Sequence, residues 1–171
     1  GPNFGFDLCV NKVSAVQMEG LDLSSWESAY SGAEPVRQST LEAFIAKFAA
    51  VGFSDRAFYP CYGMAEATLM ISGGKVSEAP AVCRVQSESL EAGVIEVVNT
   101  PQDAEGVTTF VSCGRTWLDA EVAIVDPETG QRCEGDRVGE IWARGSSMAQ
   151  GYWQRPDATQ ETFSARISEL N

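Results

Sequence analysis

Residues 26–66, WESAYSGAEPVRQSTLEAFIAKFAAVGFSDRAFYPCYGMAE, contain the pattern that decides the fold. Residues 26–30 predict a short buried strand, and a glycine-containing loop follows at 31–35. Four apolar side chains then recur at i, i+3, i+4 and i+7, a spacing that places them on one face of an α-helix: Leu41, Phe44, Ile45 and Phe48. The middle of this stretch is therefore predicted to be an amphipathic helix.

The ends of this helix are marked by residues that suit helix boundaries. Pro35 suits the first turn, because its φ is compatible with a helix and an N–H would be unpaired there anyway. Gly52 suits the C-terminal stop. Residues 53–59 then lead into a strand, and a second glycine-containing turn follows at 62–66. The order of strand, loop, helix, strand and loop predicts a right-handed parallel βαβ unit.

Short strands and turns are expected in the second half of the chain. Glu121 to Val125 predicts an apolar strand, and residues 126–130 predict a tight turn because they contain Asp, Pro and Gly. Residues 138–143 would be the return strand of a hairpin, and residues 156–163 a short helix. A helix is also expected at the start of the chain, with Asn3 as its N-cap and an apolar stripe at Phe4, Leu8 and Cys9.

These patterns predict an α/β fold. Residues 1–75 are expected to form a parallel-sheet βαβ layer with nucleotide-binding loops. Residues 76–171 are expected to form a β-rich subdomain that resembles a distorted barrel. The chain has 171 residues, enough to bury a core of its own.

Composition narrows the classes of function. The formal net charge of −12 repels phosphate backbones and anionic lipid, so no nucleic-acid partner is expected. The absence of histidine excludes Ser-His-Asp and Cys-His triads and His-ligated zinc within this chain. The five cysteines, which lack C-x-x-C spacing, predict reduced thiols in a cytoplasmic protein, with a zinc or disulfide framework as the alternative. Neither a signal peptide nor a transmembrane segment is expected.

Two glycine-containing turns are the candidate binding elements. The turn at 31–35 precedes a helix, where glycine lets the backbone approach a flat ligand. In the turn at 62–66, Tyr62 could stack on a base and Glu66 could hold Mg²⁺. Because ligands bind at the carboxyl ends of parallel strands, both turns would face one crevice. The alternative is that both are ordinary turns, with a buried Tyr62 and a solvated Glu66.

Three segments together resemble the adenylate-forming superfamily, which includes acyl-CoA synthetases and peptide-synthetase adenylation domains. Tyr62-Gly63-Met64-Ala65-Glu66 resembles the Y-G-x-x-E nucleotide motif of that superfamily. The stretch from Gly139-Glu140-Ile141 through Gly151-Tyr152 to Phe163 resembles its G-E-[IL]…G-Y…P-x-x-T…F motif. From residue types and spacing alone, the aromatic residues Trp142, Tyr152 and Trp153 in this stretch are interpreted as packing residues.

Finer features resemble one branch, the fatty acyl-AMP ligases. Ala65 stands directly before the motif Glu, as in that branch, whereas luciferase-like and CoA-ligase members usually have Thr. Further similar stretches are Pro2-Asn3-Phe4, Leu21 to Trp26, Gly32 to Arg37, Tyr62 to Leu69, Val111 to Gly114 and Glu140-Ile141-Trp142. The resemblance covers nearly the whole chain.

The resemblance implies roles for particular residues. Gly32, Ala33 and Glu34 would border the adenine of ATP, and Tyr62, Gly63, Met64 and Ala65 would continue that wall. Glu66 would help to hold Mg²⁺ near the phosphates. Residues 72–100 fall where these ligases carry an insertion that restrains domain movement. The implied partners are a fatty acid and the phosphopantetheine thiol of an acyl carrier protein.

The resemblance also implies that some family motifs lie outside this chain. A Gly/Ser/Thr-rich phosphate loop would precede residue 1, a T-G-D motif would follow soon after Phe163, and the catalytic Lys belongs to a mobile C-terminal domain. We therefore expect an internal fragment of the large N-terminal domain that does not catalyse adenylation by itself. The alternatives are a fragment of a long-chain acyl-CoA synthetase and a non-catalytic interaction domain that keeps the fold.

Overall fold

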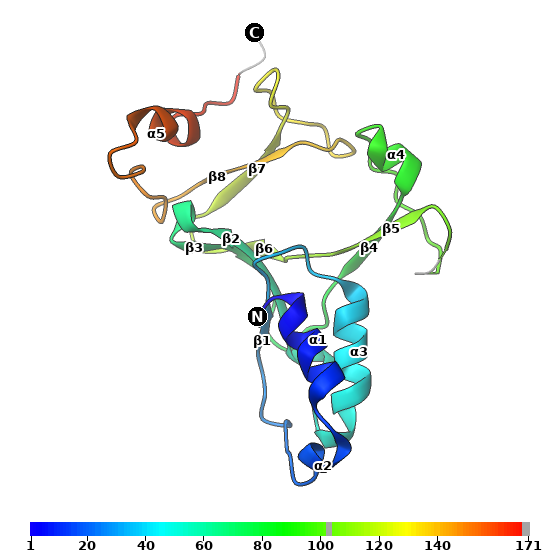
Figure 1. The fold of residues 1–171 in the computed structure, drawn as a ribbon. Helices are drawn as coiled ribbons and strands as arrows, with labels where there is room; N and C mark the ends of the chain where they lie inside the picture. The colour runs from blue at the N-terminus through cyan, green and yellow to red at the C-terminus, as the bar shows by residue number, and fades with distance from the viewer. Residues whose placement is uncertain (102–103, 169–171) are drawn as a thin grey trace. The chain divides into compact units, whose positions relative to one another are not determined.

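The computed structural model describes residues 1–101 and 104–168 (Figure 1). The chain forms two compact units. Unit 1 comprises Gly1–Gly63, Ser72–Cys83 and Thr109–Arg115, and unit 2 comprises Met64–Ile71, Arg84–Thr108 and the described residues from Thr116 onward. The two units therefore alternate along the chain. The predicted division into residues 1–75 and 76–171 stays a prediction about the complete domain.

The helices and strands follow the order expected of an α/β protein. The helices are α1 (Asn3–Lys12), α2 (Ala15–Met18), α3 (Gln38–Phe48), α4 (Ser87–Glu91) and α5 (Pro156–Phe163), with 3-10 turns η1 (Ala49–Val51), η2 (Asp55–Ala57) and η3 (Ala65–Ala67). One sheet has the order β1 (Ala29–Ser31), β2 (Phe58–Met64), β3 (Leu69–Gly73), β6 (Arg115–Thr116). The other pairs are β4 (Val82–Gln86) with β5 (Val107–Val111), and β7 (Glu121–Val125) with β8 (Glu140–Arg144).

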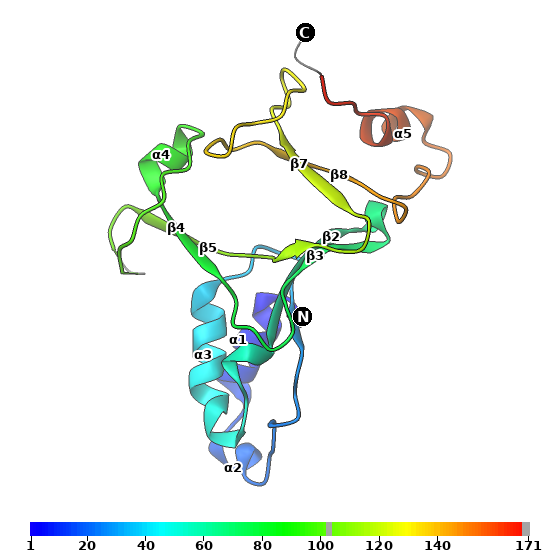
Figure 2. The ribbon, with the colours of Figure 1, turned by 180° about the vertical axis from the view of Figure 1, so that it is seen from behind.

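The predicted parallel βαβ unit is confirmed in unit 1. β1 pairs with β2 in parallel, with Ala29 opposite Phe58, Tyr30 opposite Tyr59 and Ser31 opposite Pro60. The connection between these strands contains α3, which lies beside α1 in both views (Figure 1 and Figure 2). Because β1 and β2 are parallel neighbours, their carboxyl ends lie at the same edge of the sheet.

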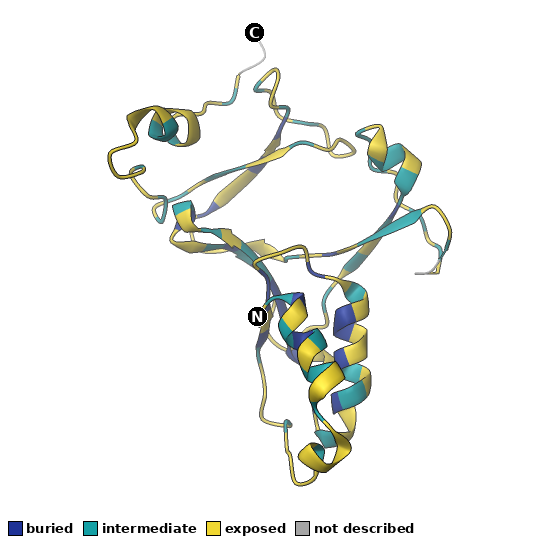
Figure 3. Ribbon diagram, viewed as in Figure 1, coloured by how far each residue is buried: buried dark blue, intermediate teal, exposed yellow. Residues whose placement is uncertain are grey.

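The apolar face of α3 is the centre of the core of unit 1. Leu41, Phe44 and Phe48 are buried, as the spacing predicted, and Ile45 is half-buried. Figure 3 shows buried residues in dark blue along α3. The Phe44 ring meets five other aromatic rings with centroid distances of 4.4 to 6.2 Å: Phe6, Trp26, Phe48, Phe53 and Phe58. Most of these pairs meet edge to face, the arrangement that aromatic quadrupoles favour.

The boundaries of α3 were predicted correctly at one end only. Gly52 follows the helix with φ = 91°, a left-handed conformation that favours glycine, so the predicted stop is confirmed. Pro35 does not lie in the first turn, because the helix begins at Gln38 with Arg37 as its N-cap. The loop is longer than predicted, and Val36 within it is buried in the core.

The predicted N-terminal helix is present, but its predicted cap and apolar stripe are wrong. Phe4 and Leu8 are 69% and 52% exposed, whereas Phe6 and Asn3 are buried. Asn3 lies inside the helix after Pro2, and its side chain bonds to another segment of unit 1 instead of to its own helix. This short helix therefore has a second set of periodically spaced residues, and packing against α3 buries that set.

Unit 2 contains the hairpin and the last helix that the sequence predicts. β7 and β8 pair antiparallel, with Ala123 opposite Trp142, and α5 begins at Pro156. In the turn between the strands, Asp126 Oδ1 accepts hydrogen bonds from the backbone N–H groups of Glu128 and Thr129. Among the described residues, β4–β5 and β7–β8 are separate two-stranded sheets, β6 joins the four-stranded sheet, and no closed barrel is present.

Replacement of Phe44 tests whether α3 holds unit 1 together. Phe44→Ala leaves a cavity among the aromatic rings and should lower the free energy of unfolding by about 3–5 kcal/mol. Urea denaturation followed by circular dichroism measures this change. Phe4→Ala on the exposed side of α1 is the matched control and should change stability by less than about 0.5 kcal/mol. Equal effects of the two substitutions would contradict the assigned core.

Candidate functional site

In unit 1, the first glycine-containing segment lies beside the strand that leads into the second. Ser31 ends β1 opposite Pro60 of β2, so Gly32, which follows β1, lies beside Cys61 in the middle of β2. A Cβ atom on Gly32 would lie 2.6 Å from the carbonyl oxygen and 2.9 Å from the Sγ atom of Cys61. No side chain fits between them, so Gly32 is required by the approach of the second strand.

Cys61 adds a hydrogen bond to this contact. Its Sγ donates to the backbone carbonyl of Ser31 at 3.6 Å. Burial raises the pKa of the Cys61 thiol, which keeps the thiol protonated and able to donate. Gly32 of the segment at 31–35 thus contacts Cys61, the residue directly before the segment at 62–66. That the two segments form one binding site stays a prediction.

Hydrogen bonds attach the loop after Gly32 to the start of α1. Glu34 Oε1 accepts a hydrogen bond of 2.7 Å from the backbone N–H of Asn3, a favourable place for a carboxylate because helix N-termini are electropositive. The Asn3 side chain donates to the carbonyl of Pro35 at 2.9 Å and accepts from the N–H of Arg37 at 3.0 Å. Asn3 is only 2% exposed, so these bonds are shielded from water.

These hydrogen bonds fix the positions of the candidate adenine-binding residues. Ala33 and Glu34 are exposed, and Ala33 has φ = 71°, a left-handed conformation that is uncommon for a residue with a Cβ. Sequence reasoning missed the part that Asn3 plays here. The only signal was a polar residue at the start of an apolar helix, which was interpreted as a cap.

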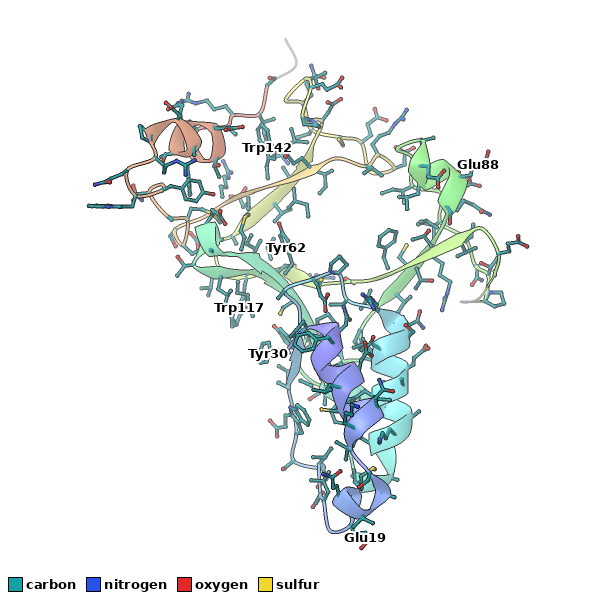
Figure 4. All side chains as sticks on the ribbon, viewed as in Figure 1. Glu19, Tyr30, Tyr62, Glu88, Trp117 and Trp142 are labelled. Atoms are coloured by element: carbon teal, nitrogen blue, oxygen red, sulfur yellow. The ribbon has the colours of Figure 1, made fainter. Side chains whose placement is uncertain are left out.

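Tyr62 and Gly63 belong to a strand, whereas the sequence predicted a turn. β2 continues to Met64, and Tyr62 projects from it half-buried (Figure 4). Gly63 and Ala65 are exposed and Met64 is half-buried. Tyr62 is therefore not enclosed in the core. A fully enclosed Tyr62 could not contact a base.

Glu66 lies in unit 2, on the short turn η3. The turn is anchored by Ala67, which is completely buried, and is followed by Thr68 and Leu69 with φ of 54° and 93°. The hydroxyl of Tyr152 donates a hydrogen bond to Glu66 Oε1. That bond holds the pKa of Glu66 below its ordinary value and raises the pKa of Tyr152.

The segment before Tyr152 is also attached to η3 within unit 2. The N–H of Ala149 donates to the carbonyl of Glu66 at 2.7 Å, and the hydroxyl of Thr68 donates to the carbonyl of Ser147 at 2.6 Å. One residue earlier, Ser146 bonds to Asp119 through both its N–H, at 2.8 Å, and its hydroxyl, at 3.0 Å. Backbone and side-chain contacts therefore converge on Glu66 from residues far away in the sequence.

The carboxylate of Glu66 is a suitable ligand for a magnesium ion whose other ligands come mainly from a substrate. Among the described residues, no group of three or more His, Cys, Asp or Glu side chains could hold a metal ion. A single carboxylate suits Mg²⁺, which keeps several waters and takes further oxygens from nucleotide phosphates. Glu66 is thus compatible with the expected cation, provided that phosphates supply the remaining ligands.

Comparison with known proteins agrees with these features. Residues 3–153 match the family model described as AMP-binding enzyme. The medium-chain-fatty-acid–[acyl-carrier-protein] ligase JamA of Moorena producens is 47% identical over 169 residues, which are 99% of this chain and 28% of that protein. The chain therefore spans about 28% of the length of this curated relative.

Solved structures give the same result. The fatty acid AMP ligase from Legionella pneumophila superposes with a TM-score of 0.92 at 40% identity, over 100% of this chain and 29% of that one. A fatty acyl-adenylate ligase from L. pneumophila, solved in complex with acyl adenylate and pyrophosphate, gives 0.86 at 42% identity, over 94% of this chain and 27% of that one.

The resemblance to fatty acyl-AMP ligases is confirmed at the level of sequence and fold. Within the described residues, no helix combines the length and apolar character needed to span a membrane. Since the family model matches most of the residues and the fold agrees, the chain belongs to the family of AMP-binding enzymes.

Proposed function

We propose that this chain is part of an ATP-dependent ligase that activates a fatty acid as an acyl-adenylate and transfers the acyl group to an acyl carrier protein. The longer enzyme that this proposal implies is called the parent ligase below. The observation that carries the proposal is the contact of Gly32, directly after the carboxyl end of β1, with Cys61 of the parallel neighbour β2. In open α/β sheets, ligands bind outside such strand ends.

In this proposal the backbone around the contact is a wall for adenine. Gly32, Ala33 and Glu34 border one edge of the base, and Tyr62, Gly63, Met64 and Ala65 continue the wall. The hydrogen bonds of Asn3 to the 34–37 loop keep this wall in place before the nucleotide arrives. Exposure of Ala33, Glu34 and Gly63 supports their access to a ligand.

Glu66 is the proposed metal ligand. A bound Mg²⁺ would neutralise phosphate charge while pyrophosphate leaves. In the reaction, a carboxylate oxygen of the fatty acid forms a bond to the α-phosphorus of ATP. The bond from that phosphorus to the bridging oxygen breaks, and pyrophosphate departs with the electron pair. Glu66 contributes charge and position to this step, and no residue of this chain is assigned as the catalytic acid or base.

An apolar hollow in unit 1 supports a hydrocarbon substrate. Its volume is about 560 Å³, and its walls come from α1, β1, α3 and the segment before β1: Gly5, Phe6, Cys9, Leu23, Trp26, Tyr30, Phe44 and Phe48 among others. Gly5 on α1 faces this hollow without a side chain, and a Cβ atom there would meet no heavy atom within 4 Å. We infer that the acyl chain of the fatty acid occupies this space.

The acceptor and the cellular setting complete the proposal. JamA is named for an acyl carrier protein as acceptor, and at 47% identity it supports the same acceptor here. A CoA ligase is the alternative. All five cysteines are free, which supports a reducing, cytoplasmic setting.

Replacement of Glu66 tests the metal assignment in the parent ligase. Glu66→Gln keeps the size of the side chain but removes its charge, so Mg²⁺-dependent adenylation should fall by roughly 10²-fold. ATP–pyrophosphate exchange with a fatty acid measures it. Glu19→Gln, on the exposed end of α2, is the control and should leave exchange unchanged. An unaltered exchange rate in Glu66→Gln would remove Glu66 from the metal site.

Enlargement of Gly5 tests the acyl site. Gly5→Leu places a side chain into open space in the hollow, and leucine is also the better helix former by about 0.8 kcal/mol. The variant should fold, and its kcat/KM for the longest accepted fatty acids should fall on the order of tenfold while shorter acids are retained. Gly5→Ala is the control. A chain-length profile identical to that of the parent ligase would place the acyl chain elsewhere.

The acceptor test separates the remaining alternatives. The parent ligase, supplied with ATP and a fatty acid, should acylate the phosphopantetheine thiol of an acyl carrier protein in preference to free CoA. Preference for CoA would instead indicate an acyl-CoA synthetase. Absence of both acyl-adenylate formation and transfer would favour a non-catalytic interaction domain.

A further inference from the structure

The second motif of the sequence reaches the candidate metal ligand through Tyr152, for which sequence reasoning predicted only packing. The backbone of Tyr152 is fixed first. Gly151 has φ = 143°, and a Cβ atom there would lie 2.3 Å from the Cγ2 atom of Thr159. This close approach brings the N–H of Tyr152 to 2.9 Å from Thr159 Oγ1, which in turn donates to the carbonyl of Arg155 at 2.8 Å. The start of α5 therefore determines where Tyr152 lies.

The direction of the Tyr152 side chain is fixed next. Its ring packs edge to face on Phe163 at a centroid distance of 5.4 Å. The hydroxyl at the end of this ring donates to Glu66 Oε1, and the side chain of Thr162 is its second hydrogen-bonding neighbour. A ring that is packed on one side and hydrogen-bonded at its tip loses little further freedom when a ligand binds nearby.

Glu66 has few other restraints on its carboxylate. Its backbone is attached through Ala149, but among the described residues Tyr152 is its only side-chain hydrogen-bond partner. The backbone N–H of Glu66 itself is the other hydrogen-bonding group that lowers the pKa of this carboxyl. Without the Tyr152 hydroxyl, the carboxylate would be free to rotate about a flexible side chain, and that freedom would be lost again on binding a cation.

We propose that Tyr152 is a positioning residue that holds Glu66 Oε1 and so leaves Oε2 directed for the cation that accompanies ATP. This inference rests on the proposed function, because it concerns the same carboxylate. It gives Gly151 and Thr159 a purpose too, since both are needed to place the Tyr152 ring. The alternative is a purely structural link, in which the Tyr152 to Glu66 bond only attaches α5 and its preceding loop to η3.

Tyr152→Phe in the parent ligase separates these two possibilities. Phenylalanine keeps the ring that packs on Phe163 and removes only the hydroxyl. The affinity for Mn²⁺ in the presence of a non-hydrolysable ATP analogue should fall roughly 5- to 10-fold. Electron paramagnetic resonance of the free ion measures this affinity. Binding of the same analogue without divalent cations should be unchanged. Tyr59→Phe on β2 is the matched control, because Tyr59 has no contact with Glu66, and it should leave Mn²⁺ binding unchanged.

The Glu66→Gln background shows whether the effect passes through the carboxylate. In that background Tyr152→Phe should cause no further loss of Mn²⁺ binding, since the two residues act as one unit. Unchanged Mn²⁺ affinity in Tyr152→Phe, with or without a lower melting temperature, would overturn the positioning role and leave the structural link. Unchanged Mn²⁺ affinity in Glu66→Gln would instead overturn the metal site of the proposed function.

Discussion

The approach of Gly32 to the backbone of Cys61 is the constraint on which the candidate site depends. Two parallel strands can bring their following residues this close only if one of them has no side chain, because a Cβ atom would lie 2.6 Å from a carbonyl oxygen. Ala33 and Glu34 follow directly after this contact, and Tyr62 follows Cys61 in β2. The buried Asn3 then fixes the loop through its bonds to Pro35 and Arg37. In our proposal, the backbone held by these contacts borders a flat ligand.

Electrostatics explain why a cation ligand matters in this chain. The net charge of −12 opposes the approach of a nucleotide triphosphate, so phosphate charge has to be offset locally. Glu66 contributes to that only together with a metal ion, since a carboxylate by itself adds to the repulsion. The Tyr152 hydroxyl favours the ionised form of Glu66, as the lowered pKa of the carboxyl reflects. The same hydrogen bond that orients the group therefore also keeps it ready to bind a cation.

The two motifs of the family are joined physically in unit 2. The turn η3 contains the last two residues of the first motif, Ala65 and Glu66, and the segment of residues 146–152 belongs to the second. Bonds from Ala149 to Glu66 and from Thr68 to Ser147 connect them, although they lie about eighty residues apart in the sequence. Such contacts have no local signature, because each involves a backbone carbonyl that any residue could supply. This explains why sequence reasoning assigned the aromatic residues of the second motif to packing alone.

Local patterns were sufficient for α3, for its C-terminal end and for the hairpin of β7 and β8. The spacing of Leu41, Phe44 and Phe48 determined α3, Gly52 its end, and the Asp126 turn the hairpin, because each depends on neighbours within a few residues. What tertiary structure alone decided was the buried face of α1, the anchoring by Asn3 and the contact of Tyr152 with Glu66. A short helix offers more than one apolar face, and a polar side chain several partners. Packing against distant segments selects among them, and a sequence read in one dimension does not contain those distances.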